Sequence, residues 1–221
     1  MEHLKQLAAC AAVICLMGGL TAFADSEFRI ENPELDYEVI DAYPFDGYGD
    51  FGPFQSASSV LLGTTGEARE VIEFDISPFV VPSGEQITQA LFQVYIADNY
   101  IAGMGVPWGD TPDLIALQGY VGNGVADLSD FEAGNDNILG RMDLIDPYIG
   151  QQLTWDITDY VRELVDAGET WLGLTVKAEE FGGIMLFEGP SSPMLTINTT
   201  VPEPATLSVL ALAGLALLRR R

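Results

Sequence analysis

The chain has 221 residues, of which 33 are acidic and nine basic, and its formal charge is −24. We expect no nucleic-acid binding from it, because contacts to phosphate need Lys and Arg. Its one histidine and two cysteines are His3, Cys10 and Cys15. A chain processed beyond them has no Ser-His-Asp triad, no cysteine nucleophile and none of the usual zinc, copper or haem ligands.

Residues 1–24 have the pattern of a secretory signal peptide. A short region with one lysine precedes an apolar run, Leu7–Leu20, and the small residues Ala22 and Ala24 follow. An A-x-A pattern of this kind is a signal-peptidase site, so we expect export through the Sec translocon and cleavage before Asp25. A permanent transmembrane helix is the alternative for this N-terminal helix.

The segment from residue 25 to residue 200 is expected to be one acidic domain. It keeps 31 acidic and five basic side chains, a formal −26, because Glu2, Glu203, Lys5 and the three C-terminal arginines lie outside it. About 176 residues suit a single domain. Without disulfides, such a domain depends on its core or on bound hard cations. The charge favours solubility and self-repulsion and suits divalent cations or cationic polymers.

Period-two alternation predicts β-strands in this domain. In Arg69–Ile76, three apolar side chains are expected to face a core: Ile72, Phe74 and Ile76. Three acids of the same run are expected to face water: Glu70, Glu73 and Asp75. In Trp171–Lys177 we expect Leu172, Leu174 and Val176 inside and Thr175 and Lys177 outside. Near the end of the domain, Leu195 and Ile197 alternate with Thr196 and Asn198.

Six further apolar runs are bounded by turn residues: Tyr37–Ile40, Ser59–Leu62, Ile87–Ile96, Leu114–Val121, Leu153–Ile157 and Gly183–Phe187. Nine short strands predict an all-β domain, a two-sheet, jelly-roll-like β-sandwich. One short helix is expected from the capping residue Thr158 to Gly168, with Val161, Leu164 and Val165 as its apolar stripe. We expect this helix to cover one mouth of the sandwich.

Four motifs in order resemble the DNRLRE-type jelly-roll domain. They are Glu70–Asp75 with Ser77, Pro82–Gly84 and Ile87–Leu91; Leu153–Val161; Gly173–Leu174; and Phe187–Glu188 with Ser192–Ile197. The chain departs from that family where Val71 and Ile72 stand in place of an Arg-Leu pair. The resemblance implies a jelly-roll sandwich, similar in shape to carbohydrate-binding modules, and no enzymatic activity.

A loop rich in Asp and Asn is the candidate metal site. Its oxygen-bearing residues are Asp127, Asp130, Glu132, Asn135, Asp136 and Asn137. Ca²⁺ takes six to eight oxygen ligands, so Ca²⁺ is the one cofactor that this loop suggests, although the spacing is not that of an EF-hand. We predict that Ca²⁺ raises the melting temperature of the domain. An ordinary polar surface loop is the alternative.

Aromatic residues are the candidate glycan site, because flat rings stack on sugar rings. A loop between residues 41 and 54 holds Tyr43, Phe45, Tyr48, Phe51 and Phe54 among several aspartates. Tyr95, Tyr100, Trp108 and Tyr120 could extend an exposed face. From these we choose Tyr43, Tyr48, Tyr100 and Trp108, with packing under the sandwich as the alternative. Trp155 and Trp171 lie in predicted strands and are expected in the core.

The C-terminal segment 201–221 has three parts. Val201, Pro202, Glu203 and Pro204 form a short motif, Ala205–Leu218 is almost wholly apolar, and Arg219, Arg220 and Arg221 end the chain. As a helix, the apolar run is roughly 21 Å long, which is short against a hydrocarbon core of about 30 Å. The arginines are expected to stay cytoplasmic, which places the domain on the other side of the membrane. A buried core helix is the alternative.

These three parts resemble the PEP-CTERM sorting signal of Gram-negative bacteria. The resemblance implies that a membrane protease of the exosortase type recognises Val201–Pro204 and the arginine cap and removes the tail. It further implies transient anchoring in the inner membrane, then an outer-surface or extracellular-matrix location and an association with exopolysaccharide. The tail residues are recognised by another enzyme and are not catalytic.

The sequence therefore predicts an exported, tail-processed surface or matrix protein with a structural or adhesive role. A carbohydrate-binding module, with or without Ca²⁺, is the second hypothesis, and exposed aromatics at one end would favour it. A glycan-active enzyme is the third, and a deep cleft with two facing acids would favour it. We assign no catalytic residues, because 31 acids form chance pairs freely.

Overall fold

A computed structural model describes residues 25–42, 46–54, 59–98, 103–107, 109–186 and 193–202. The predicted signal peptide with Ala22 and Ala24, the tail from Glu203 onward, and the aromatic residues Tyr43, Tyr100 and Trp108 lie outside these ranges. No helix within the described ranges is both long enough and apolar enough to cross a membrane.

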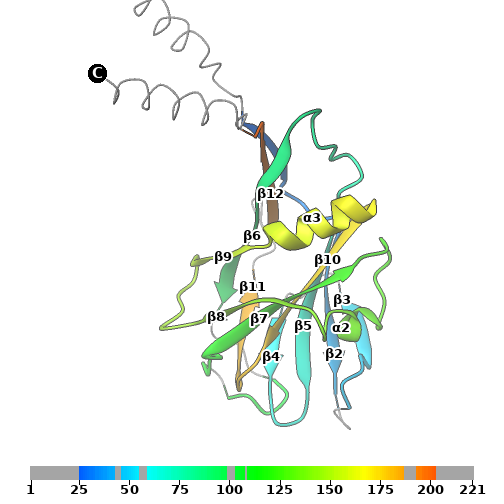
Figure 1. Cartoon of the computed structure of the whole chain (residues 1–221). Coiled ribbons are helices and arrows are strands. Elements are labelled where there is room, and N and C mark those ends of the chain that lie inside the picture. The colour runs from blue at the N-terminus through cyan, green and yellow to red at the C-terminus, as the bar shows by residue number, and fades with distance from the viewer. Residues whose placement is uncertain are drawn as a thin grey trace, which may run out of the picture.

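The described chain is mostly β-strand, which confirms the all-β prediction (Figure 1). Its strands are β1 Ser26–Ile30, β2 Leu35–Asp41, β3 Phe51–Phe54, β4 Ser59–Leu62, β5 Glu67–Asp75, β6 Gln86–Asp98, β7 Leu114–Val121, β8 Ile138–Asp143, β9 Gln152–Asp156, β10 Trp171–Ala178, β11 Gly182–Leu186 and β12 Met194–Thr200. Its two described helices are α2 Asp130–Ala133 and α3 Thr158–Ala167. The sequence predicted only α3, so α2 is a correction.

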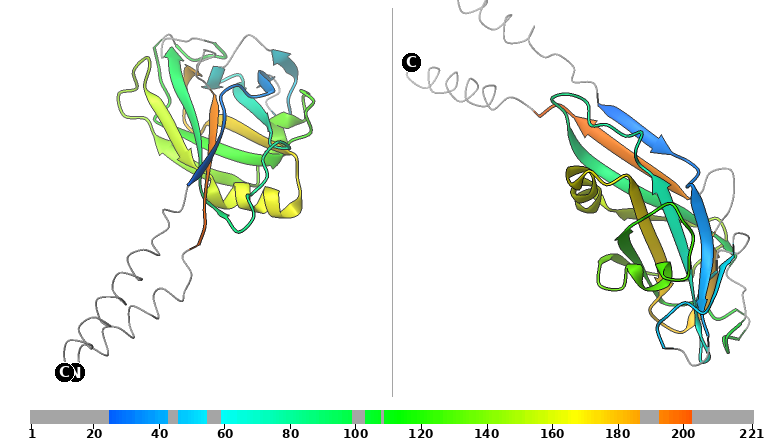
Figure 2. Two further views of the ribbon diagram at one scale, coloured as in Figure 1. Left: turned by 90° about the horizontal axis from the view of Figure 1, so that it is seen from above. Right: turned by 90° about the vertical axis from the view of Figure 1, so that its right-hand side faces the viewer.

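All the strands join into one antiparallel sheet that curls on itself (Figure 2). Its main order is β1-β12-β6-β11-β4-β5-β10-β7-β8, with β2 and β3 beside β5 and β9 beside β6. The first part of the 13-residue strand β6 pairs with β12 and β9, and its end at Ile96–Asp98 pairs with β11. Strand β6 therefore links two limbs of the curled sheet. One limb consists of β1, β12, β9 and most of β6, and the other consists of β2, β3, β4, β5, β7, β8, β10 and β11.

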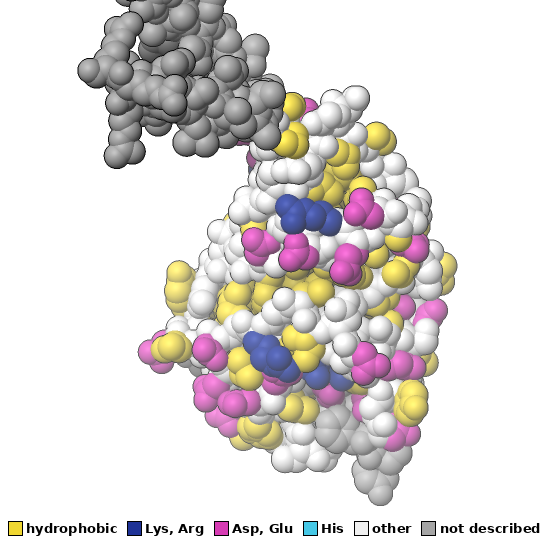
Figure 3. All heavy atoms as spheres, viewed as in Figure 1, with side chains coloured by type: hydrophobic (Ala, Val, Ile, Leu, Met, Phe, Trp, Pro, Cys, Tyr) yellow, Lys and Arg dark blue, Asp and Glu magenta, His cyan; other side chains and the backbone are white. Residues whose placement is uncertain are grey.

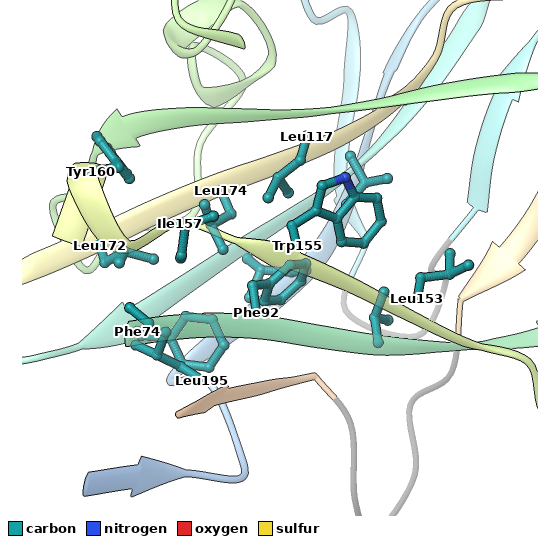
Figure 4. Packing of buried hydrophobic residues seen from close by; sticks show 14 of the residues in the cluster. Phe74, Phe92, Leu117, Leu153, Trp155, Ile157, Tyr160, Leu172, Leu174 and Leu195 are labelled. Carbon is teal, nitrogen blue, oxygen red and sulfur yellow. The ribbon is translucent and has the colours of Figure 1, made fainter. Parts of the chain in front are cut away.

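The main core lies between the two limbs (Figure 4). Phe74 of β5 packs edge-on against Phe92 of β6 with ring centroids 6.2 Å apart, and Phe92 stacks on Trp155 of β9 at 5.8 Å. The side chains predicted to face inward are buried there: Ile72, Phe74, Ile76, Leu172, Leu174, Val176, Leu195 and Ile197. The clusters of buried apolar residues in the described chain lie between residues 28 and 197, within the segment 25–202.

The outer face of β5 and β10 is not solvated as predicted. Glu73 and Thr175 on this face are fully buried, and Glu70 is fully buried on the opposite, core-facing side, which it shares with Ile72 and Phe74. The segment from Gly122 to Asn137, which contains α2 and is here called the cover, lies across this face (Figure 1). A second hydrophobic cluster forms beneath it from Tyr37, Val39, Val71, Tyr120 and Phe131. Trp171 is also a correction: it is half-buried against Gly124 of the cover rather than in a core.

Three strands that the sequence did not predict are β1, β3 and β8. Each lies at an edge: β1 and β8 end the main strand order, and β3 pairs only with β2. Strand β3 contains Gly52 and Pro53, and β8 contains Gly140. Gly and Pro argue against a central strand but are tolerated at edges, which is why periodicity failed at β3 and β8.

Helix α3 closes one end of the core with Tyr160, Val161 and Leu164 (Figure 1). The predicted role of Thr158 as its N-cap is wrong, because Ile157 holds that position. The Thr158 hydroxyl donates to the Asp156 carboxylate and accepts the Ala90 N–H at 2.8 Å. The predicted end at Gly168 is confirmed, with the left-handed φ of 77° that favours glycine.

Candidate functional site

The predicted metal-binding residues are mostly engaged inside the protein. The buried Asp130 accepts hydrogen bonds from the Tyr37 hydroxyl and from the Asp127 N–H. Asn135 Oδ1 accepts from Arg69 at 2.6 Å, and the Asn137 side chain donates to the Gly119 carbonyl at 3.0 Å.

The remaining two residues of that loop do not complete a coordination shell. Glu132 is half-buried and Asp136 is exposed. Within the described ranges, no group of three or more His, Cys, Asp or Glu side chains is placed to hold a metal ion. The structure thus brings these residues together as parts of the cover, and the effect of Ca²⁺ stays a prediction.

Arg69 of β5 binds the cover to the sheet. Its guanidinium pairs with Glu67 at 2.5 Å, donates to the Phe131 carbonyl at 2.6 Å and lies 3.9 Å from the centroid of the Phe131 ring. Only 5% of the Arg69 side chain and 10% of the Glu67 side chain are exposed. A buried ion pair needs such additional hydrogen bonds to offset its loss of hydration.

Glu73 of β5 is a second residue that binds the cover to the sheet. Its carboxylate accepts from the Tyr120 hydroxyl at 2.9 Å and from the backbone N–H groups of Asn123 and Gly124 at 3.2 and 2.7 Å. Burial raises the pKa of the Asp130 carboxyl and of the Tyr37 and Tyr120 hydroxyls. The two phenols therefore stay protonated as donors, and the acids beneath the cover serve the fold.

The described aromatic candidates do not form one ring-shaped site. Tyr48 is 61% exposed and lies near the edge strand β3, whose Phe51 and Phe54 are exposed as well. Tyr95 is half-buried. Tyr120 is buried and bonded to Glu73, so its predicted exposure is wrong.

A hollow lined by several acidic residues lies between α3 and β8 and is here called the α3 groove. It has a volume of about 520 Å³. Its polar lining residues are Thr88, Asn137, Asp156, Thr158, Asp159, Tyr160, Arg162 and Glu163, and its apolar ones are Ile138, Leu139 and Ile157. Figure 3 shows a band of hydrophobic side chains below α3 with charged side chains along both of its sides.

Local folding explains why charges line one side of the α3 groove. Helix α3 buries Val161 and Leu164, so the residues between them point away from the core. Arg162 donates to the Ile87 carbonyl at 3.0 and 2.7 Å and to Asp159 at 2.9 Å, which holds its guanidinium in place. Asp159 and Glu163 are exposed, and Asp156 accepts from Thr158.

Tyr160 is the unusual residue of the α3 groove. Its side chain is buried, with 8% exposure, and within the described chain its hydroxyl has no hydrogen-bond partner. The ring occupies the space above Gly119 of β7, where a Cβ would lie 2.7 Å from the ring carbon Cε1. Burial raises the pKa of this hydroxyl, so it remains a donor at physiological pH.

Sequence reasoning missed the α3 groove. Its charged residues lie in Asp156–Glu163, which the sequence indicated only as a strand-to-helix turn. Its other wall, Asn137–Leu139, belongs to the unpredicted edge strand β8 and the residue before it. No signal in the sequence alone joins these two segments.

No protein-family model matches this chain, and no curated protein matches it either. The residues therefore carry the functional argument by themselves.

Proposed function

We propose that residues 25–200 are the mature domain of an exported surface or matrix protein with a structural or adhesive role near exopolysaccharide. The observation that carries this proposal is the surplus of acid. Each arginine of the domain has an acidic partner within the protein: Arg29 with Glu31, Arg69 with Glu67, Arg141 with Glu179 and Arg162 with Asp159. Among the described residues only Lys177 is a base outside these pairs.

The surplus of 31 acids over five bases must therefore be balanced from outside the chain. Acidic side chains are spread over the visible face rather than gathered in one patch (Figure 3). A surface of this kind repels copies of itself and attracts divalent cations or cationic polymers. We propose that divalent cations bridge the domain to acidic groups of the surrounding polymer, and we propose no catalytic activity.

The positions of the domain's two ends support the proposed export and sorting. Strands β1 and β12 pair with Ser26 opposite Thr199. Residue 25 and residue 201 therefore leave the sheet side by side, at one end of the domain (Figure 2). A signal peptide of residues 1–24 and a PEP-CTERM-like tail of residues 201–221 would both hold the domain by that end.

We propose further that the curled sheet is a jelly-roll sandwich similar to the DNRLRE type. In support, the motif around Asp156 and Thr158 is the turn from β9 into α3, and Glu70–Asp75 is a central strand. Contacts between Phe74 and Phe92 join two facing limbs, as in a sandwich.

Co-sedimentation tests the proposed function. Purified residues 25–202 would be mixed with exopolysaccharide from the producing cells in CaCl₂, in EDTA, and in NaCl of the same ionic strength as the CaCl₂. We expect the domain to sediment with the polymer in CaCl₂ and much less in the other two. Equal recovery in the supernatant of all three mixtures would overturn the proposal.

A further inference from the structure

We propose that the α3 groove binds a neutral or amino-sugar unit of a glycan. The proposal deepens the adhesive role proposed above and rests on it for its biological setting. It concerns a second mode of association, which depends on direct contacts rather than on bridging cations.

The lining of the α3 groove has the two faces that a sugar ring needs. Ile138 and Leu139 offer aliphatic surface to the C–H groups of a ring. Carboxylate, amide and hydroxyl groups of the other lining residues offer acceptors and donors to its hydroxyls. The volume of about 520 Å³ falls within the range of roughly 300–1,000 Å³ that is typical of small-ligand sites.

Tyr160 is the independent sign that a ligand belongs in the α3 groove. Buried hydroxyl groups are normally hydrogen-bonded, because an unmet donor loses water without gaining a partner. The Tyr160 hydroxyl lacks a partner within the described chain, yet its residue lines an open hollow. The hydroxyl oxygen itself has almost no exposed surface, so an oxygen atom of a ligand in the α3 groove would accept this hydrogen bond once the side chains over it move aside.

The charges of the α3 groove decide which sugars fit. Asp156, Asp159 and Glu163 stand against the single guanidinium of Arg162. That guanidinium is already committed to Asp159 and the Ile87 carbonyl. The lining is thus net negative, so it accepts hydroxyl and ammonium donors and repels uronic acids and sulfated sugars.

Binding in the α3 groove therefore differs from cation bridging in its requirements. Direct hydrogen bonds from Tyr160 and to Glu163 need no divalent ion, so this binding should persist in EDTA. Acidic sugars, which divalent cations would bridge to the domain, are the ones that the α3 groove rejects. The two modes can consequently be tested and can fail separately.

Calorimetric or NMR titration of residues 25–202 in EDTA tests the α3 groove. The probes are a glucosamine disaccharide, a neutral hexose disaccharide and a galacturonic acid disaccharide. We expect the first two to bind and the third to bind at least several-fold more weakly. No binding by either of the first two, or tightest binding by the acidic probe, would overturn the proposal. Co-sedimentation in CaCl₂ would be unaffected by that failure.

Two substitutions locate the site. Tyr160→Phe keeps the ring over Gly119 and removes only the hydroxyl, so we expect roughly three- to tenfold weaker binding, the value of one hydrogen bond. Tyr148→Phe is its matched control, since Tyr148 is exposed and lies outside the α3 groove. Glu163→Gln should weaken the glucosamine probe more than the neutral one, with Glu169→Gln as control. Equal binding by Tyr160→Phe and its control would overturn the assignment of Tyr160.

Discussion

The cover and the α3 groove are both rich in acidic residues, but their carboxylates have different partners. Where the cover meets the sheet, Asp130 of the cover and Glu73 of β5 accept hydrogen bonds from buried tyrosines and backbone N–H groups. In the α3 groove, Glu163 is exposed while the donor Tyr160 has no partner within the described chain. Asp130 and Glu73 are thus buried and bonded within the fold. Asp156 and Asp159 of the α3 groove are bonded to Thr158 and Arg162 but stay exposed, as Glu163 does, so a ligand can reach them.

Removing the Arg69 side chain, which binds the cover to the sheet, should lower the free energy of unfolding more than any other change considered. Arg69→Met leaves Glu67 as a buried, unpaired charge, and such a loss typically costs about 3–5 kcal/mol. Arg29→Met is the matched control, because the Arg29–Glu31 pair is about half-exposed and such pairs contribute roughly 0–1 kcal/mol. Urea denaturation at pH 7 measures both. Equal free energies of unfolding for the two variants would contradict the role of Arg69.

Removing one donor beneath the cover should have a smaller effect. Tyr37→Phe leaves the buried Asp130 with one donor fewer, and we expect a loss of roughly 1–3 kcal/mol in the free energy of unfolding. Tyr48→Phe removes an exposed hydroxyl and should change the free energy by less than about 0.5 kcal/mol. Chemical denaturation of both variants compares them, and a neutral Tyr37→Phe would show that Asp130 does not depend on this donor.

The pH dependence of stability should also separate the two regions. Burial raises the pKa of Asp130, so the folded state binds this proton more tightly than the unfolded state, whose Asp pKa is about 3.9. Stability should rise as pH falls from neutral through the raised pKa, and this contribution is lost as pH rises again. The melting temperature measured from pH 7.5 to pH 4.5 should increase by about 2–4 °C for each kcal/mol gained.

Asp130→Asn should reduce that pH dependence, and the remainder is expected from Asp41, whose pKa burial also raises. Asp159→Asn at the exposed rim of the α3 groove should leave it unchanged. A melting temperature that falls steadily from pH 7.5 to pH 4.5, with no difference between the wild type and Asp130→Asn, would contradict the assignment.

Adding Ca²⁺ should change the stability of the folded domain least. We expect Ca²⁺ to raise the melting temperature, because it screens the repulsion among 31 acids. Thermal melts in CaCl₂, in EDTA and in NaCl of the same ionic strength as the CaCl₂ measure this. Identical melting temperatures in all three would contradict the prediction, and a gain in CaCl₂ well above that in NaCl would reveal a discrete site.

The difference between the limbs and the cover also explains how far the sequence could be interpreted. Ile72 and Phe74 alternate with polar residues and are buried as their spacing predicts. Glu73 in the same strand looks solvent-facing, and nothing local shows that Gly124 and Tyr120 supply its donors from 51 and 47 residues away. Long-range partners decide which acids are buried, and periodicity carries no information on them.

The α3 groove could not be predicted from the sequence for the same reason, because long-range pairing brings its two walls together. Asp156 and Glu163 belong to a predicted turn and helix, but Leu139 lies in an edge strand that contains glycine and lacks alternation. Only the pairing of β8 with β7 brings that strand opposite α3. Edge strands make few apolar contacts, so their sequences are weakly constrained and are the hardest to predict.

Mapping the binding surface tests the central claim most directly. Backbone amide NMR spectra of ¹⁵N-labelled residues 25–202 would be recorded during titration with the glucosamine disaccharide. We predict chemical-shift changes at 137–139 and 156–163, which line the α3 groove, and none at 122–136 of the cover. Changes confined to the cover or to the exposed aromatics of 46–54, or none at all, would contradict the account.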